Sequence, residues 1–371
     1  MIIGRQVGIM HKPIQDRFKI SPFLPLYVIM AMQIGIGVLG FQRVVAKDAG
    51  NDAWISVLGA GLIIHVIVWV MYKICETVQG DVLTANVYVF GNIAGKALNS
   101  FFIFYYILTC AGVLGGLIEI IKVWMFPELN TFVFASVYLL LAVYIINGGL
   151  RTVAGMAFFS LVLPAYLLLV FGLAVKHADF TNLLPVFDHT LIDMIKSGYR
   201  MSLTYLGYDV LLFIYPFIKE PQKSKKWAHL GVFITTILYT VLAILTFAYF
   251  SGGLLEKSIW PTLEMWKIVQ LPFIERFEYI GIANWAIIII PNVAISLWVA
   301  SRVTKQVFHL KQRKGVIVAA LLCLGIMMFL NSRERINMVL DLTASLSFAV
   351  SYLFIPFLYL SVLIAKKVKK K

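Results

Sequence analysis

The sequence predicts an all-α integral membrane protein of one domain, which crosses the bilayer about ten times as two inverted repeats of five spans. Three observations predict this class. Of the 371 residues, 61% are hydrophobic and 13% are charged, about half the charged fraction of an average soluble domain. The apolar residues form long runs, and a helix needs about 20 such residues to cross the hydrocarbon core. Lysine and arginine gather in alternate connections between these runs.

Ten apolar runs have the length and composition of membrane spans. The predicted spans are 20–45, 53–75, 97–125, 130–147, 152–175, 198–218, 228–251, 275–304, 315–331 and 338–365. The first repeat therefore covers about 20–175 and the second about 198–365, and a basic tail follows at 366–371. Two longer outer connections lie at 176–197 and 252–274, and the second is amphipathic enough to hold a short interfacial helix.

The placement of basic residues predicts that both ends of the chain are cytoplasmic. With that orientation, 21 of the 32 lysines and arginines lie on the inner side. They are Arg5, Lys12, Arg17, Lys19, Lys73, Lys96, Arg151, Lys219, Lys223, Lys225, Lys226, Arg302, Lys305, Lys311, Arg313, Lys314, Lys366, Lys367, Lys369, Lys370 and Lys371. The formal charge of +14 is thus a topology signal and a contact for anionic membrane lipid, and no nucleic-acid partner is expected.

Five spans per repeat is an odd number, so the second repeat enters the membrane from the opposite side. This arrangement is typical of transporter folds in which the first span of each repeat is broken. Span one contains Gly35, Gly37 and Gly40 within 33–40, and span six contains Tyr205, Gly207 and Asp209. We expect both stretches to leave helical geometry.

An unwound stretch exposes N–H groups at one half-helix end and carbonyls at the other, which suit a carboxylate and an ammonium group respectively. Glycine allows the unwinding and lets a ligand approach the backbone closely. A small amino acid carries both charges, so a binding site between spans one and six is predicted. The alternative is that these glycines only allow close helix packing.

Side chains inside the spans supply further candidates. Asp209 would be costly at that depth unless it meets a ligand cation, titrates, or is neutral and hydrogen-bonded within the bundle. Tyr105 is expected to line the same cavity. Glu119 is expected to pair with Lys122 three residues further on, and His65, alone in span two, is interpreted as a hydrogen-bonded structural histidine and not a ligand.

The start of span eight carries Glu275, Arg276 and Glu278, which predict a gate or a subunit contact. The sequence contains no Ser-His-Asp set in loops, no phosphate-binding glycine loop and no His-rich cluster. No enzyme activity, catalytic residue, metal or cofactor is therefore predicted.

Four blocks of sequence resemble one known family. They are the 35–43 glycine run Gly-Ile-Gly-Val-Leu-Gly-Phe-Gln-Arg, the 206–209 stretch Leu-Gly-Tyr-Asp, the 259–262 stretch Ile-Trp-Pro-Thr and the 274–278 stretch Ile-Glu-Arg-Phe-Glu. The chain resembles the B-subunit family of bacterial endospore germinant receptors, within the amino acid–polyamine–organocation transporter superfamily. It departs from the family pattern at Gln42, where many relatives carry proline, and at Asp209, where glutamate also occurs.

The resemblance implies a LeuT-type fold and a place in the inner membrane of the dormant spore. It also implies assembly with an A subunit and a C subunit, and binding of a small nutrient germinant, usually an amino acid, by the B subunit. Trp260, in one of the family blocks, joins the candidate gating or contact residues. Two other functions stay open, an amino-acid secondary transporter and a germinant-gated ion or water channel. Uptake of labelled amino acid would favour the first and ligand-dependent conductance the second.

The predicted topology can be tested with reporter fusions. A reporter joined after Ala365 is expected on the cytoplasmic side, and one inserted within 180–190 on the opposite side, because lysine and arginine in short loops set orientation. Activity measured on the same side for both fusions would exclude the ten-span arrangement.

Overall fold

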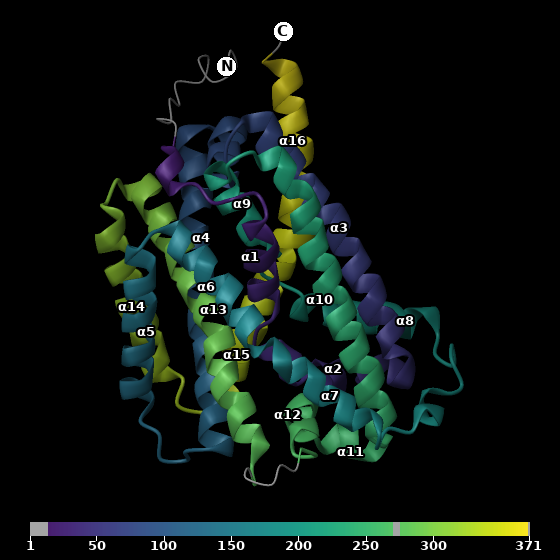
Figure 1. Ribbon diagram of the computed structural model, residues 1–371. Helices are drawn as coiled ribbons and strands as arrows, with labels where there is room; N and C mark the ends of the chain where they lie inside the picture. Colours follow the sequence, from purple (N-terminus) through teal and green to yellow (C-terminus); the bar gives the residue numbers. More distant parts are fainter. Residues whose placement is uncertain (1–13, 270–274, 370–371) are drawn as a thin grey trace.

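The computed structural model describes residues 14–269 and 275–369, and it folds as a bundle of helices (Figure 1). Among these residues the only β pairing is an isolated bridge between Ile20 and Ile218. Five residues singled out above, Arg5, Lys12, Ile274, Lys370 and Lys371, lie outside the described residues. The all-α class predicted from composition is confirmed.

The helices of the first half are α1 (Leu24–Gln33), α2 (Phe41–Ala49), α3 (Ala53–Val78), α4 (Val82–Trp124), α5 (Thr131–Asn147), α6 (Leu150–Val162) and α7 (Leu167–Val175). Those of the second half are α8 (Leu191–Thr204), α9 (Leu211–Ile214), α10 (Pro221–Tyr249), α11 (Gly252–Lys257), α12 (Pro261–Trp266), α13 (Phe277–Phe308), α14 (Gln312–Phe329), α15 (Arg333–Phe348) and α16 (Ile355–Val368). Short 3-10 segments precede or interrupt several of them, including η2 (Asp16–Phe18), η3 (Ile36–Leu39) and η7 (Tyr208–Val210), and a π-helical turn, η9 (Ala349–Phe354), joins α15 to α16.

Seven helical stretches of the described chain are long and apolar enough to cross a membrane. Three shorter apolar stretches, Leu24–Gln33, Thr131–Asn147 and Tyr208–Phe217, lie within predicted spans one, four and six. The number of crossings stays a prediction. The outer connection at 252–274 holds two short helices, α11 and α12.

The start of predicted span three differs most from the sequence-based boundary. Asp81 caps the first turn of α4, where its carboxylate accepts a hydrogen bond from the Thr84 N–H at 3.0 Å. A helix therefore begins at Val82, well before residue 97, and Gly91 (φ 79°) kinks it. The hydropathy of a run does not reveal a capped segment that precedes it.

At the end of the bundle where η2 lies, hydrogen bonds join the chain that enters span one to the chain that leaves span six. The Ile20 N–H donates to the Phe217 carbonyl at 2.7 Å, and the Lys219 N–H donates to the Ile20 carbonyl at 2.9 Å. The Arg151 guanidinium donates to the carbonyls of Lys19 (2.7 Å) and Asp16 (2.8 Å). These bonds hold the two chain segments together beside α6.

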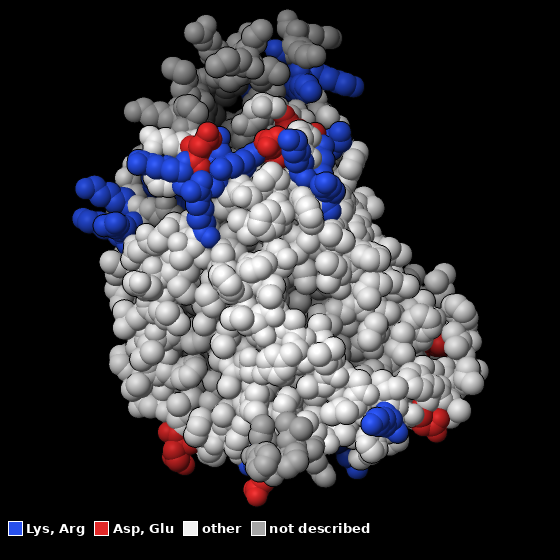
Figure 2. Space-filling model, in the orientation of Figure 1, with Lys and Arg blue, Asp and Glu red and all other residues white. Residues whose placement is uncertain are grey.

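Charged side chains are segregated on the face shown in Figure 2. Lysines and arginines gather at the end of the molecule that carries both termini, while the middle of this face is almost free of charge. An uncharged band between charged ends is the surface expected of a protein whose middle lies in hydrocarbon.

Candidate functional site

The helix interruptions in spans one and six lie against each other. Helix α1 ends at Gln33, and α2 does not begin until Phe41. Helix α8 ends at Thr204, and Gly207 follows with a left-handed φ of 102° before η7. The Gln33 amide donates to the Tyr205 carbonyl at 3.0 Å, so the two stretches that depart from helical geometry are in direct contact.

A cavity of about 420 Å³ lies between these interruptions, within the range of about 300–1,000 Å³ usual for small-molecule sites. Elements α2 and α8, which contribute lining residues, lie in the half of the molecule away from the termini (Figure 1). The lining residues are Met32, Gln33, Gly35, Ile36, Gly37, Gly40, Phe41, Arg43, Val44, Tyr105, Tyr106, Thr109, Val113, Gly116, Glu119, Arg200, Leu203, Thr204, Leu206, Gly207, Asp209, Ile259, Trp260, Asn292, Arg333, Asn337, Leu340, Asp341, Thr343, Ala344 and Ser347.

The structure brings together most of the residues predicted for the ligand site. Six of the seven, together with Trp260, line the cavity; the six are Gly35, Gly37, Gly40, Tyr105, Gly207 and Asp209. Tyr205 does not line it, because its ring is buried against Tyr239, with ring centroids 4.9 Å apart. Tyr205 contributes instead through its backbone carbonyl, which accepts the Gln33 bond.

Three of the predicted gating or contact residues lie elsewhere. Glu275, Arg276 and Glu278 stand at the start of α13 and do not line the cavity. The Arg276 Nε lies 2.9 Å from the Glu278 Oε1, and its guanidinium stacks over the Tyr279 ring at 4.1 Å. A role for these three residues in gating or subunit contact stays a prediction.

Asp209 is the buried charged group of the cavity, with a relative exposure of 1%. Its Oδ2 accepts a hydrogen bond from the Tyr106 hydroxyl at 2.8 Å, whereas Oδ1 has no hydrogen-bond partner among the described residues. The Gln33 Oε1 of the same cavity is also buried without a partner there. Unpartnered buried oxygens are costly, so these two mark a place where a donor group is favoured.

The rim of the cavity carries charges of both signs. Glu119 pairs with Arg333 of α15 at 3.3 Å, so the predicted pair with Lys122 is wrong. Spacing within one helix reveals only neighbours on that helix, and α15 supplies a partner from far along the sequence. The Arg333 guanidinium also lies 5.3 Å from the Trp260 ring centre, which links α4, α15 and the outer connection.

The family block at 259–262 is bound directly to the interruption of span one. The Thr262 hydroxyl donates to the Val38 carbonyl at 3.0 Å and accepts from the Gln42 amide at 2.8 Å. A Cβ on Gly40 would lie 2.6 Å from the Ile259 carbonyl oxygen, so only glycine allows this approach. Gln42, noted above only as a departure from the family pattern, is therefore a buried support for the outer connection.

The arrangement suits a small ligand with a positive and a negative end. Carboxylate and amide oxygens lie at Asp209 and Gln33, while the N–H groups of Gly35 and Gly37 have no backbone acceptor among the described residues. Arg43 lines the cavity and takes part in no ion pair within the described chain. No group of three His, Cys, Asp or Glu side chains among these residues is placed to hold a metal.

Sequence reasoning missed Gln33, Asn292 and Arg333 as lining residues. Gln33 stands at the end of α1, Asn292 follows the proline inside α13, and Arg333 begins α15. A polar residue beside a helix interruption is the signal that would have found Gln33, and a polar residue next to a proline within a span is the signal for Asn292.

The fold and the cavity define a helical membrane protein with a transporter-type fold. A Na⁺-coupled sialic acid symporter, solved in a substrate-bound outward-open state, matches with a TM-score of 0.61 over 94% of this chain and 81% of that chain, at 15% identity. MhsT in complex with L-phenylalanine matches with a TM-score of 0.62 over 91% and 87%, at 12% identity. At such low identity the likeness shows the fold alone, which is of the LeuT type.

The chain belongs to the spore germination protein family, whose model matches residues 19–338. Spore germination protein GerQB of Bacillus cereus is 40% identical over 94% of this chain and 97% of its own length. Spore germination protein A2 of Bacillus subtilis (strain 168) is 23% identical over 95% and 98%. The resemblance stated from sequence is thereby confirmed at the level of the family.

The contact between the two interruptions predicts unequal effects of alanine at two glycines. Gly207→Ala places a Cβ 2.8 Å from the Met32 carbonyl oxygen at a left-handed φ, so we expect a loss of about 1–3 kcal/mol of stability. Gly35→Ala meets nothing closer than the Asn292 Oδ1 at 3.8 Å and should cost far less. Thermal unfolding of the purified variants in detergent measures both, and equal midpoints would contradict the close approach of Gly207 to Met32.

Proposed function

We propose that this chain is the B subunit of a spore germinant receptor, and that it binds a small nutrient, an amino acid, in the cavity between spans one and six. The observation that carries the proposal is the buried Asp209 at that cavity, with one carboxylate oxygen unpartnered among the described residues. Membership of the spore germination family supplies the biological setting.

In this proposal the ligand ammonium group binds Asp209 and the Gln33 side chain. A charge-assisted bond of this kind contributes about 1.5–3 kcal/mol. The ligand carboxylate binds the free N–H groups at Gly35 and Gly37, and Arg43 adds positive charge at the rim. The ligand side chain then lies toward Val113, Gly116 and Leu340.

The proposal includes an inner-membrane location in the spore, cytoplasmic termini, and A and C subunits as partners. The gathering of lysine and arginine at the end that carries the termini supports this orientation (Figure 2). The neighbouring subunits would respond to a shift in the conformational equilibrium of this chain, which a ligand produces only by preferring one state.

A second candidate function is amino-acid transport by this chain itself. The observation that favours it is the fold, which is shared with a sialic acid symporter and with an L-phenylalanine complex of MhsT. Uptake of labelled amino acid into vesicles that hold only this chain would support transport. Conductance that depends on ligand would instead support a gated channel.

Replacing Asp209 tests the ligand site. Asp209→Asn keeps the shape and removes the charge, so spores with this variant should need roughly 10- to 150-fold more germinant, the equivalent of about 1.5–3 kcal/mol. The readout is the germinant concentration that gives half-maximal germination across a panel of amino acids. Asp341→Asn, at the exposed rim of the same cavity, is the matched control and should change the threshold little.

Two other outcomes have distinct meanings. An unchanged threshold with a flattened pH dependence would assign Asp209 to proton coupling. An Asp209→Asn variant equal to the parent in threshold, pH dependence and abundance would reduce Asp209 to a packing residue. Tyr106→Phe removes the hydrogen bond that the Tyr106 hydroxyl donates to Asp209 without removing charge. Its germinant threshold should lie between those of the parent and of Asp209→Asn.

Gly37→Val tests whether the interruption of span one must leave space for a ligand. A Cβ on Gly37 already lies 2.9 Å from the Thr204 Cγ2, so a branched side chain fills the cavity between α8 and η3. We expect a weakened germinant response, with the protein still inserted. Membrane abundance measured by immunoblot is the control, and a normal response at normal abundance would mean that Gly37 only packs helices.

A further inference from the structure

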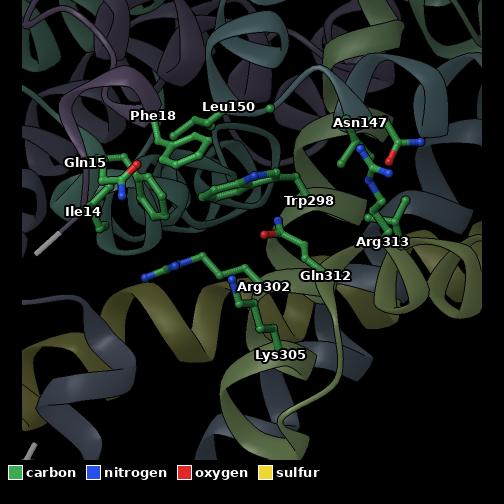
Figure 3. Close-up of a pocket in the computed structure, with 14 residues that line it drawn as sticks. Ile14, Gln15, Phe18, Asn147, Leu150, Trp298, Arg302, Lys305, Gln312 and Arg313 are labelled. Carbon is green, nitrogen blue, oxygen red and sulfur yellow. The ribbon is translucent and has the colours of Figure 1, made fainter. Parts of the chain in front are cut away.

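A second cavity of about 420 Å³ lies at the end of the molecule that carries the termini, apart from the site described above (Figure 3). It is formed where η2, the junction of α5 and α6, the end of span six, α13 and α14 meet. Its lining residues are Ile14, Gln15, Phe18, Ile146, Asn147, Gly149, Leu150, Phe217, Trp298, Arg302, Lys305, Gln312, Arg313 and Val316.

The charges in this cavity are of one sign. Arg302, Lys305 and Arg313 line it, and no aspartate or glutamate is among its lining residues. Lys305 and Arg313 take part in no ion pair within the described chain. In Figure 3, Arg302 and Lys305 project side by side from α13, and Gln312 and Arg313 stand on the neighbouring α14. Two helices thus bring together three cations, of which only Arg302 pairs with a carboxylate within the described chain.

Arg302 is built into this site. Its Nη2 lies 2.7 Å from the buried Asp81 Oδ2, and its guanidinium stacks over the Phe217 ring at 4.3 Å. The Arg302 Nε is buried and has no hydrogen-bond partner among the described residues. An ion pair holds the guanidinium in place, while one N–H of that guanidinium still lacks an acceptor. Such a group is costly unless an acceptor binds there.

The first turn of α14 points to the same chemistry. It begins at Gln312 without a side-chain cap and contains no acidic residue. Free N–H groups and the positive end of the helix dipole favour an anion, yet the residues there are Lys311, Arg313 and Lys314. Basic side chains at a helix N-terminus are unfavourable unless an anion offsets their charge.

A basic surface that only sets topology would not need a concave shape with aromatic walls. Here Phe18 and Trp298 form apolar walls beside the cations (Figure 3), and Phe217 lies against the Arg302 guanidinium. We infer that this cavity binds the phosphate group of an anionic ligand, either the headgroup of a membrane phospholipid or a soluble phosphate ester. The phosphate takes the Arg302 Nε–H, Lys305 and Arg313, and the rest of the ligand lies against the aromatic walls. This inference does not depend on the germinant proposal.

The test uses the full chain in nanodiscs, with the midpoint of thermal unfolding as the readout, because a ligand that binds only the folded state raises this midpoint. In discs of phosphatidylcholine alone, inorganic phosphate should raise the midpoint by a few degrees and saturate. Sodium chloride at matched ionic strength should not. In discs that contain phosphatidylglycerol, a midpoint that is already raised and no longer responds to phosphate identifies the lipid headgroup as the ligand. A response equal to that in phosphatidylcholine identifies the soluble ester.

Variants test whether the rise of the unfolding midpoint comes from binding in this cavity. Lys305→Gln with Arg313→Gln should abolish the phosphate or lipid response, while Lys305→Arg with Arg313→Lys should keep it. Lys366→Gln with Lys367→Gln removes the same charge from the tail, outside the cavity, and should also keep it. The inference is overturned if the parent responds neither to phosphate nor to phosphatidylglycerol, or if the glutamine double variant responds as the parent does.

Discussion

The structure depends on how unwound backbone is satisfied inside an apolar bundle. Water cannot hydrogen-bond to exposed N–H and C=O groups at membrane depth, so a helix can open there only if other parts of the chain supply partners. The Gln33 amide bonds to the Tyr205 carbonyl, and the Gln33 carbonyl in turn accepts from the Tyr239 hydroxyl at 2.9 Å. The Val38 carbonyl accepts from Thr262. The interruptions of spans one and six therefore have to meet, and the cavity forms where they do.

That requirement also explains why the outer connection belongs to the site. Thr262 ties α12 to Val38 of η3 and to Gln42 of α2, and Gly40 leaves room for the Ile259 carbonyl oxygen. Trp260, next in the chain, then reaches the cavity and lies over Arg333. The Trp260 side chain is thus held at the cavity by the contacts that its neighbours Ile259 and Thr262 make with span one. Because these bonds join the outer connection to the interruption of span one, a movement of that interruption also moves the outer connection.

Local features were predictable from sequence, and long-range contacts were not. Hydropathy predicted the helical class, and the glycines with Asp209 predicted where the helices open, since these depend on residues near one another in the chain. The partner of Asp209 is Tyr106, about a hundred residues away, and no periodicity reveals it. His65 is a hydrogen-bonded structural histidine, as expected, but the sequence did not identify its partner: its Nδ1 lies 2.9 Å from that of His229 on α10. Residues of α3 and α10 become neighbours only through packing.

The two ends of the bundle differ in the contacts that a rearrangement caused by a ligand would have to break. At the end where η2 lies, four hydrogen bonds join the chain that enters span one to its neighbours, two between Ile20 and the chain around Ile218 and two from Arg151. Together they contribute about 2–6 kcal/mol, at about 0.5–1.5 kcal/mol each. Coupling between a ligand and a distant site is about 1–3 kcal/mol. If a nutrient binds as proposed, a coupling energy of this size matches these four hydrogen bonds only at the low end of their range and falls short of them over the rest of it. The comparison supports the proposed sensing role, in which the change passes through the helices to a neighbouring subunit, over a full transport cycle by this chain alone.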